Sequence, residues 1–294
     1  MSQPRFLMLR RLGSKIPSLL GLVIVVAFYL WSILEACLQL TASLLHQASI
    51  GWMLLPYNPF RESLGESLLP PSVSHLMGTD DLGRDLFSRM LYASPADAAV
   101  SVLVVLGGIC IGGIIGLVAG YFGGWTEEVN MRTTDLFLAF PALILALVIE
   151  ATLGRSVIYA IIALIAVWWP SYSRVFRGEM LTIKSMKFID AALLSGLADI
   201  SIIARHAIRS SLNTVISYAT IDLGNALVVY SILSFLGLGV APPYPEWGSL
   251  VALGLEYFPY AWWYSILPGC VITMIVVGAA LLGDGLRDLF AGEL

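Results

Sequence analysis

The run AAVSVLVVLGGICIGGIIGLVAGYF, residues 98–122, decides the fold class because it contains no charged residue. A segment of about 20 apolar residues can cross the roughly 30 Å hydrocarbon core of a bilayer. In that core every backbone polar group needs an internal partner, so the segment has to be helical. The composition agrees, since 58% of the residues are hydrophobic and only 12% are charged. The sequence therefore predicts an all-α integral membrane protein.

Five further apolar runs accompany this one, and we expect six transmembrane helices. The runs lie at about 16–38, 98–122, 136–150, 156–173, 210–236 and 258–283. Six spans place both termini on one side of the membrane. Of the 16 Lys and Arg residues, only Arg61, Arg84, Arg89 and Arg155 fall on the other side. The positive-inside rule therefore predicts a multi-pass protein of the plasma (inner) membrane with both termini in the cytoplasm.

The second run also carries a regular series of glycines. Gly108, Gly112, Gly116 and Gly120 recur every four residues. On a helix they share one side, and their lack of side chains lets a neighbouring backbone approach closely. We expect another transmembrane helix to pack against this side.

The spans divide the chain unevenly. Residues 1–97 contain a cytoplasmic N-terminus, the first span and a proline-containing outer loop. Residues 98–284 contain five closely spaced spans, and residues 285–294 form a short cytoplasmic C-terminus. Within the core, residues from about 178 to 209 form a charged cytoplasmic loop between the fourth and fifth spans.

That cytoplasmic loop contains a group of small residues. Asp190, Ala191 and Ala192 are followed by Gly196. Two alanines with a glycine four to five residues later on a short helix present a shallow face. Such a face favours close docking of a partner protein.

One polar stripe lies inside the fifth span. Asp222 falls near the membrane midplane, where a charge costs roughly 2.5–3.5 kcal/mol on insertion scales. Asn225 follows one turn later, and Tyr230 lies toward the outer end. The stripe fits a water-filled translocation path or a hydrogen bond between helices, and the sequence leaves both interpretations open.

Motifs for chemistry are missing from the sequence. It has no G-x-x-x-x-G-K-[ST] phosphate loop and no HExxH, CxxC or G-x-S-x-G motif, and its three histidines are far apart. We therefore expect no catalytic residue, metal site or cofactor, and ATP hydrolysis would belong to another chain. Two other classes compete with a non-enzymatic permease. One is an ion-coupled secondary transporter that uses Asp222, and the other is an intramembrane enzyme, for which no catalytic group is visible.

Several motifs resemble one family of transport proteins. The segment HLMGTDDLGRD, residues 75–85, is similar to the signature of the second permease subunit of dipeptide, oligopeptide and nickel ABC importers. The other matching motifs, in the family's order and spacing, are GYFGGW (120–125), FP (140–141), RVFRGE (174–179), SFLGLG (234–239), EWG (246–248) and LGDGLRD (282–288).

The resemblance implies a type I ABC importer permease fold and a set of partners. A second homologous permease would complete the translocation pathway, and two cytoplasmic ATPase subunits would bind ATP and Mg. An extracytoplasmic solute-binding protein would deliver the substrate, and no nucleic acid is involved. Peptides are the expected substrate, with nickel or oligosaccharides as alternatives. The cytoplasmic loop corresponds to the family's EAA loop, and its helix at about 189–202 would couple the permease to an ATPase.

The chain departs from the family pattern at three places. Asp190 stands where the family usually has Glu, which shortens the reach of the acid. Ala207, Ile208 and Arg209 follow His206 where the family commonly has Ile-Leu-Pro, so the bend into the fifth span loses its proline. The acid that the family often has near Tyr230 is absent.

The outer loop is open to two interpretations. Its polar residues Asp80, Asp81, Arg84 and Asp85 would either contact the binding protein and gate the outer mouth, or form a packing element before the second span. In the second case they would pair among themselves.

Overall fold

The computed structural model describes residues 15–292, apart from the side chains of residues 192 and 193. Helices form almost all of the regular structure in this range, and the one isolated β-bridge joins Thr79 and Asp85. The α-helices are α2 (Ile16–Leu44), α3 (Leu86–Phe122), α4 (Gly124–Ala139), α5 (Ala142–Leu153), α6 (Val157–Lys184), α7 (Lys187–Leu194), α8 (Asp199–Ile202), α9 (Ile208–Phe235), α10 (Trp247–Glu256) and α11 (Trp262–Ala291).

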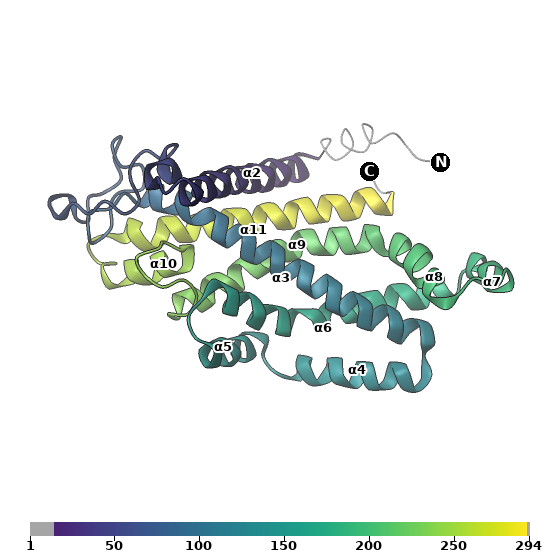
Figure 1. Cartoon of the computed structure of the whole chain (residues 1–294). Helices are drawn as coiled ribbons and strands as arrows, with labels where there is room; N and C mark the ends of the chain where they lie inside the picture. Colours follow the sequence, from purple (N-terminus) through teal and green to yellow (C-terminus); the bar gives the residue numbers. More distant parts are fainter. Residues whose placement is uncertain (1–14, 293–294) are drawn as a thin grey trace.

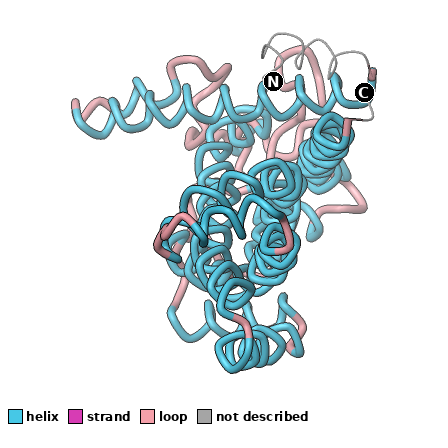
Figure 2. Tube along the Cα trace, turned by 90° about the vertical axis from the view of Figure 1, so that its right-hand side faces the viewer, coloured by secondary structure: helices cyan, strands magenta, loops and turns pink. Residues whose placement is uncertain are grey.

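The long helices form one bundle. Figure 1 shows α3, α6, α9 and α11 running along the length of the molecule, and Figure 2 shows most helices end on, with α2 at the top lying obliquely across them. The outer loop and α10 lie at one end, whereas α7 and α8 lie at the other. The first turn of α2 and the last turn of α11 lie toward the α7 end. Residues at both ends of the chain therefore share a side with the predicted docking loop.

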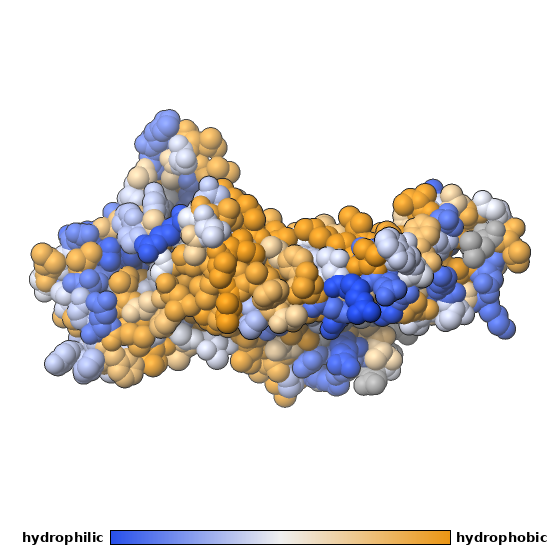
Figure 3. Space-filling view, turned by 90° about the horizontal axis from the view of Figure 1, so that it is seen from below, coloured by the Kyte–Doolittle hydropathy of each residue, from blue (hydrophilic) through white to orange (hydrophobic). Residues whose placement is uncertain are grey.

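Length and composition agree with a membrane-spanning bundle. Among the described residues, five helices are long and apolar enough to cross a bilayer: α2, α3, α6, the continuous stretch Asp199–Phe235 and α11. On the face shown in Figure 3, hydrophobic residues cover the middle and hydrophilic residues gather toward the ends. These features confirm an all-α membrane protein.

The third predicted span is not one straight helix. Helices α4 and α5 meet at an angle of 86° across a short break, and they give a sixth span only if the bent pair is counted as one. Pro141 begins the second arm, and Phe140 before it has extended backbone angles, with φ −87° and ψ 140°. Proline lacks a backbone N–H and excludes helical geometry at the preceding residue. The break is therefore caused by Phe140-Pro141, which lies within an apolar stretch that looks like one continuous span in the sequence.

The glycine series packs as the sequence predicts. A Cβ atom placed on Gly112 would lie 2.7 Å from the backbone nitrogen of Ser173 in α6, and one on Gly116 would collide with the Ser173 carbonyl. Neither position has room for a side chain, so α3 and α6 approach backbone to backbone. This contact forms the centre of the core, together with the fully buried Tyr172, Leu164 and Val104.

Candidate functional site

The predicted docking loop forms the tip of the molecule at the α7 end (Figure 1). Asp190 and Ala191 are exposed on α7, and Ala192 lies in the same helix, although its side chain is outside the described residues. Two apolar side chains that the sequence argument missed are also exposed at the tip, Leu194 at 90% and Ile200 at 73%. Large exposed apolar patches are a common feature of protein interaction sites, and these two side chains lie at the tip where the sequence predicts docking.

Gly196 does not have the place that the sequence argument gave it. The expected single helix at about 189–202 is divided, because α7 ends at Leu194 and α8 begins at Asp199. Gly196 lies in the intervening turn with φ +76°, in the left-handed region, and a Cβ placed on it would meet no atom within 4 Å. Glycine adopts this geometry without strain and commonly ends helices in this way. Gly196 therefore terminates α7 instead of extending a shallow helical face.

The loop is held to the bundle on both sides. The Tyr121 hydroxyl at the end of α3 donates to the Asp199 carboxylate at 2.6 Å, and Lys184 Nζ at the end of α6 donates to the Tyr121 carbonyl oxygen at 2.6 Å. Ile189 of α7 is buried in the main core cluster. The exposed tip is thus joined to α3 and α6 by hydrogen bonds and by a buried side chain of α7.

The connection from the loop into α9 is helical throughout. A π-helical turn at Ile203–Ala207 leads directly into α9, which begins at Ile208. The family's proline at the position of Arg209 would remove a backbone donor here. Arg209 keeps its backbone N–H, and the chain stays helical from Ile203 into α9. The loss of the proline is therefore accompanied by a continuous helical connection and not by a sharp bend.

The polar stripe of α9 is divided between contacts. Trp168 of α6 donates its indole N–H to one oxygen of the buried Asp222 at 2.5 Å, and Asn225 donates to the other at 3.3 Å. Asn225 is exposed, whereas Tyr230 is fully buried. In this structure Asp222 makes the interhelical hydrogen bond that the sequence argument weighed against a water-filled path.

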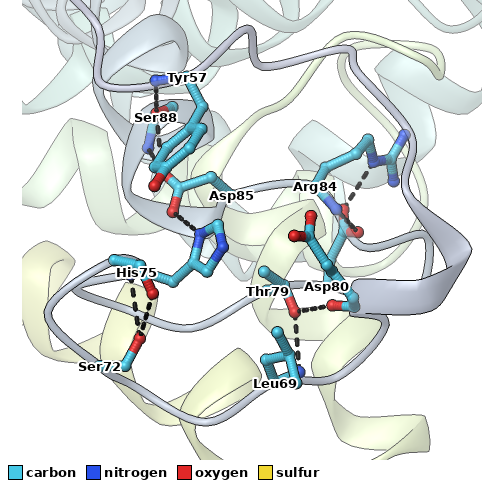
Figure 4. A network of polar contacts seen from close by, with 11 residues as sticks. Tyr57, Leu69, Ser72, His75, Thr79, Asp80, Arg84, Asp85 and Ser88 are labelled. Carbon is cyan, nitrogen blue, oxygen red and sulfur yellow. Dashed lines mark hydrogen bonds and ion pairs between the residues drawn. The ribbon is translucent and has the colours of Figure 1, made fainter.

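The predicted outer-loop residues pair mainly with one another and with their neighbours (Figure 4). The Asp80 carboxylate accepts from Arg84 Nε at 2.7 Å and from the backbone N–H groups of Leu82 and Arg84. Asp85 caps the start of α3 through Ser88 and lies 2.9 Å from His75 Nδ1. The packing interpretation accounts for these contacts, and Asp80 and Asp85 are too buried to meet a partner directly.

Asp81 has a different place. Its carboxylate is half-buried and accepts a hydrogen bond from the Tyr264 hydroxyl of α11 at 3.2 Å. This bond connects the outer loop to α11. Asp81 therefore bonds to α11, whereas Asp80 forms the ion pair with Arg84.

A cluster of buried acids near the same end was not foreseen. Asp97, Glu150 and Glu246 are fully buried, and the Asp97 side chain lies against that of Glu246. Glu246 caps α10 by accepting from the N–H groups of Gly248 and Ser249, and Glu150 Oε1 accepts from the Gly239 N–H at 2.8 Å. Burial raises the pKa of the Glu246 carboxyl above its ordinary value. In the sequence, the only indication that these three acids are buried is that each lies next to an apolar run.

Among the residues that the structure describes, no three His, Cys, Asp or Glu side chains are arranged to hold a metal ion. The geometry provides an exposed α7 tip at one end, a packed helical core, and a folded outer loop at the other end.

Comparison with known proteins assigns the family. The profile described as binding-protein-dependent transport system inner membrane component matches residues 112–293. The probable D,D-dipeptide transport system permease protein DdpC of Escherichia coli K12 is 38% identical over 80% of this chain and 79% of its own length. The dipeptide transport system permease protein DppC of Alkalihalophilus pseudofirmus is 35% identical over 92% and 84%, respectively.

A third relative is named for a different peptide, glutathione. The glutathione transport system permease protein GsiD of Pectobacterium atrosepticum is 36% identical over 76% of this chain and 74% of its own length. The profile match over residues 112–293 includes Gly112, Gly116 and Gly120 of the glycine series, the loop that contains α7, and α11 up to its end at Ala291. The chain is a multi-pass membrane protein that belongs to the family of inner-membrane components of binding-protein-dependent transport systems.

Proposed function

We propose that this chain is one of two permease subunits of an ATP-driven importer of small peptides. The relatives that match most of its length are named for D,D-dipeptides, dipeptides and glutathione, and a peptide substrate is the chemistry common to these names. A second permease subunit completes the translocation pathway, and a solute-binding protein delivers the peptide at the outer-loop end. The termini and α7 face the cytoplasm.

The observation that carries the proposal is the α7 tip. It presents exposed Leu194 and Ile200 beside the small residues of α7, and it stands on the Tyr121–Asp199 and Lys184–Tyr121 hydrogen bonds. An ATPase subunit that seats this tip in a groove would hold it in two positions, before and after ATP-driven closure. The energy of ATP enters the permease as a bias between two packings of its helices and not as chemistry in this chain.

Uptake into proteoliposomes tests the proposal. The complex of both permeases, the ATPase subunits and the binding protein is reconstituted, and uptake of labelled alanyl-alanine is measured with ATP and Mg, with ADP, and with an imposed proton or sodium gradient. The proposal predicts uptake with ATP alone. Uptake that follows the gradient and disappears in Asp222→Asn would instead establish ion coupling.

The same vesicles decide between substrate classes. Nickel ions and a labelled oligosaccharide replace the peptide, each with ATP. Nickel or oligosaccharide uptake without peptide uptake would contradict the peptide assignment and leave the ATP-driven permease intact.

A further inference from the structure

A cavity with three arginines lies at the outer-loop end, next to the Asp80–Arg84 pair described above. Its volume is about 210 Å³, and it is bounded by the outer loop, the segment that follows α9, and α10. Arg84, Arg89 and Arg155 line it together with Ser234 and Ser249, and no acidic residue does. The rest of the lining is mainly apolar, with Phe235, Leu238, Val240 and Leu253 among its residues. Three of the four basic residues at this end of the molecule therefore meet at one hollow.

The charge in this cavity is not balanced by the residues around it. Asp80 is the carboxylate that pairs with two of the arginines, at 2.7 Å from Arg84 Nε and 3.5 Å from Arg89 Nε. The Asp81 carboxylate also acts on the charge of Arg89. Arg155, in the connection between α5 and α6, adds a positive charge that no ion pair balances among the described residues. Its Nη2 atom lies 3.8 Å from the position of a Cβ on Gly237.

One donor of the Arg89 side chain has no hydrogen-bond acceptor among the described residues. The side chain is 3% exposed, one Nη atom donates to the Pro59 carbonyl oxygen, and its Nε atom has no hydrogen-bond partner among the described residues. An unsatisfied buried donor on a charged group is costly. An anion in the cavity would offset that cost, because guanidinium groups bind carboxylates through paired, charge-assisted hydrogen bonds.

We propose that this cavity receives the C-terminal carboxylate of the peptide as the peptide leaves the binding protein. This inference rests on the proposed function. It adds that the permease recognises the C-terminal carboxylate of the peptide. Arg84 and Arg89 are 7% and 3% exposed, so the end of a narrow chain reaches them more readily than a protein surface does. Ser234 lies one helical turn beyond Tyr230 on α9, which places the cavity above the stripe that contains Asp222.

Arg155 offers the test, because it is exposed and makes no ion pair among the described residues. Arg155→Gln is compared with wild type, with the conservative Arg155→Lys, and with Arg61→Gln. Arg61 is an exposed arginine at the same end that does not line the cavity. Uptake of alanyl-alanine into proteoliposomes is measured over a range of concentrations of peptide-loaded binding protein.

The maximal uptake rate should fall about tenfold in Arg155→Gln, the loss expected for a hydrogen-bonded charge pair. The concentration of loaded binding protein that gives half-maximal uptake should not change. Arg155→Lys should recover part of the rate, and Arg61→Gln should behave as wild type. Leu253→Glu, which places a carboxylate at the cavity and leaves the arginines intact, should reproduce the loss even if Arg155→Gln fails to assemble.

Three results would overturn the inference. An increased half-maximal concentration with an unchanged maximal rate would mean that Arg155 contacts the binding protein. An equal loss in Arg61→Gln would mean that only the general positive charge matters. A loss seen in vesicles with phosphatidylglycerol but not in vesicles of phosphatidylcholine alone would assign the cavity to a lipid headgroup. Wild-type vesicles that take up no peptide would instead contradict the proposed function.

Discussion

The Tyr121 hydroxyl at the end of α3 donates to the Asp199 carboxylate at the start of α8 over 2.6 Å. Tyr121 also accepts from Lys184 Nζ through its backbone carbonyl oxygen, at 2.6 Å. One residue thus joins the helix of the glycine series to both sides of the α7 tip. A displacement of the tip would reach the closest helix pair of the bundle through these bonds.

Replacement of Tyr121 by Phe should weaken this connection without unfolding the bundle. A hydrogen bond to a charged group contributes about 1.5–3 kcal/mol. We expect peptide-stimulated ATP hydrolysis by the reconstituted complex to fall about three- to tenfold, with normal assembly on size-exclusion chromatography. Tyr260→Phe, at an exposed tyrosine near the other end, is the control. Full stimulation in Tyr121→Phe would show that force does not pass through this bond.

The glycine series should tolerate no side chain at its centre. A Cβ on Gly116 would collide with the Ser173 carbonyl, and overpacking of this kind costs about 1–3 kcal/mol. Gly116→Ala should therefore lower the thermal midpoint of the purified complex. Gly269→Ala in α11, where a Cβ would meet no atom within 4 Å, should leave it unchanged or raise it. Equal midpoints for the two variants would refute the close packing of α3 and α6.

The sequence alone predicts this close helix packing, but it does not predict every helix break and helix end. Glycines at every fourth residue predict close packing of α3 against another helix, because one face of α3 then carries no side chains. Pro141 also signals its break locally, yet the apolar residues around it give the appearance of one continuous span. The turn at Gly196 is harder to foresee, because a glycine after Ala191 and Ala192 fits both a shallow helical face and a helix end.

The polar contacts depend on tertiary structure, and sequence reasoning locates them only partly. Asp80 and Arg84 are four residues apart, so their pairing could be anticipated. The contact between Asp97 and Glu246 and the meeting of Arg155 with Arg89 join distant segments. No spacing rule predicts such contacts, which arise only when the bundle brings the segments together.

The outer loop should depend on the Asp80 carboxylate. Removal of one partner from a buried ion pair costs about 3–5 kcal/mol, and Asp80→Asn would leave Arg84 and Arg89 without their shared counter-ion. We expect faster amide hydrogen exchange across residues 63–85 and a lower thermal midpoint. Glu62→Gln, at an exposed acid in the same loop, should exchange as wild type. Unaltered protection in Asp80→Asn would mean that the pair does not organise the loop.

Stability should depend on pH through the buried acids. Burial raises the pKa of Glu246, so the native state retains this proton to a higher pH than the unfolded chain does. The free energy of unfolding should therefore fall as pH rises from the ordinary pKa of Glu246 to its raised value. Wild-type protein in detergent should show a thermal midpoint that decreases across this interval.

Asp97→Asn should reduce that decrease. Both Asp97 carboxylate oxygens are without a hydrogen-bond donor among the described residues, whereas an Asn side chain can donate to Glu246. We expect Asp97→Asn to be more stable than wild type at neutral pH by about 1 kcal/mol. Asp284→Asn, at an exposed acid of α11, should follow the wild-type profile. A destabilised Asp97→Asn at neutral pH would contradict this account of the pair.

The most direct test of the central claim is ATP hydrolysis by the reconstituted complex with loaded binding protein, comparing wild type, Leu194→Arg and Leu64→Arg. Leu194 is 90% exposed at the α7 tip, and Leu64 is 74% exposed at the opposite end. If the tip seats in an ATPase subunit, assembled Leu194→Arg should lose the stimulation that wild type and Leu64→Arg retain. Equal stimulation in all three would mean that the α7 tip is not the coupling element.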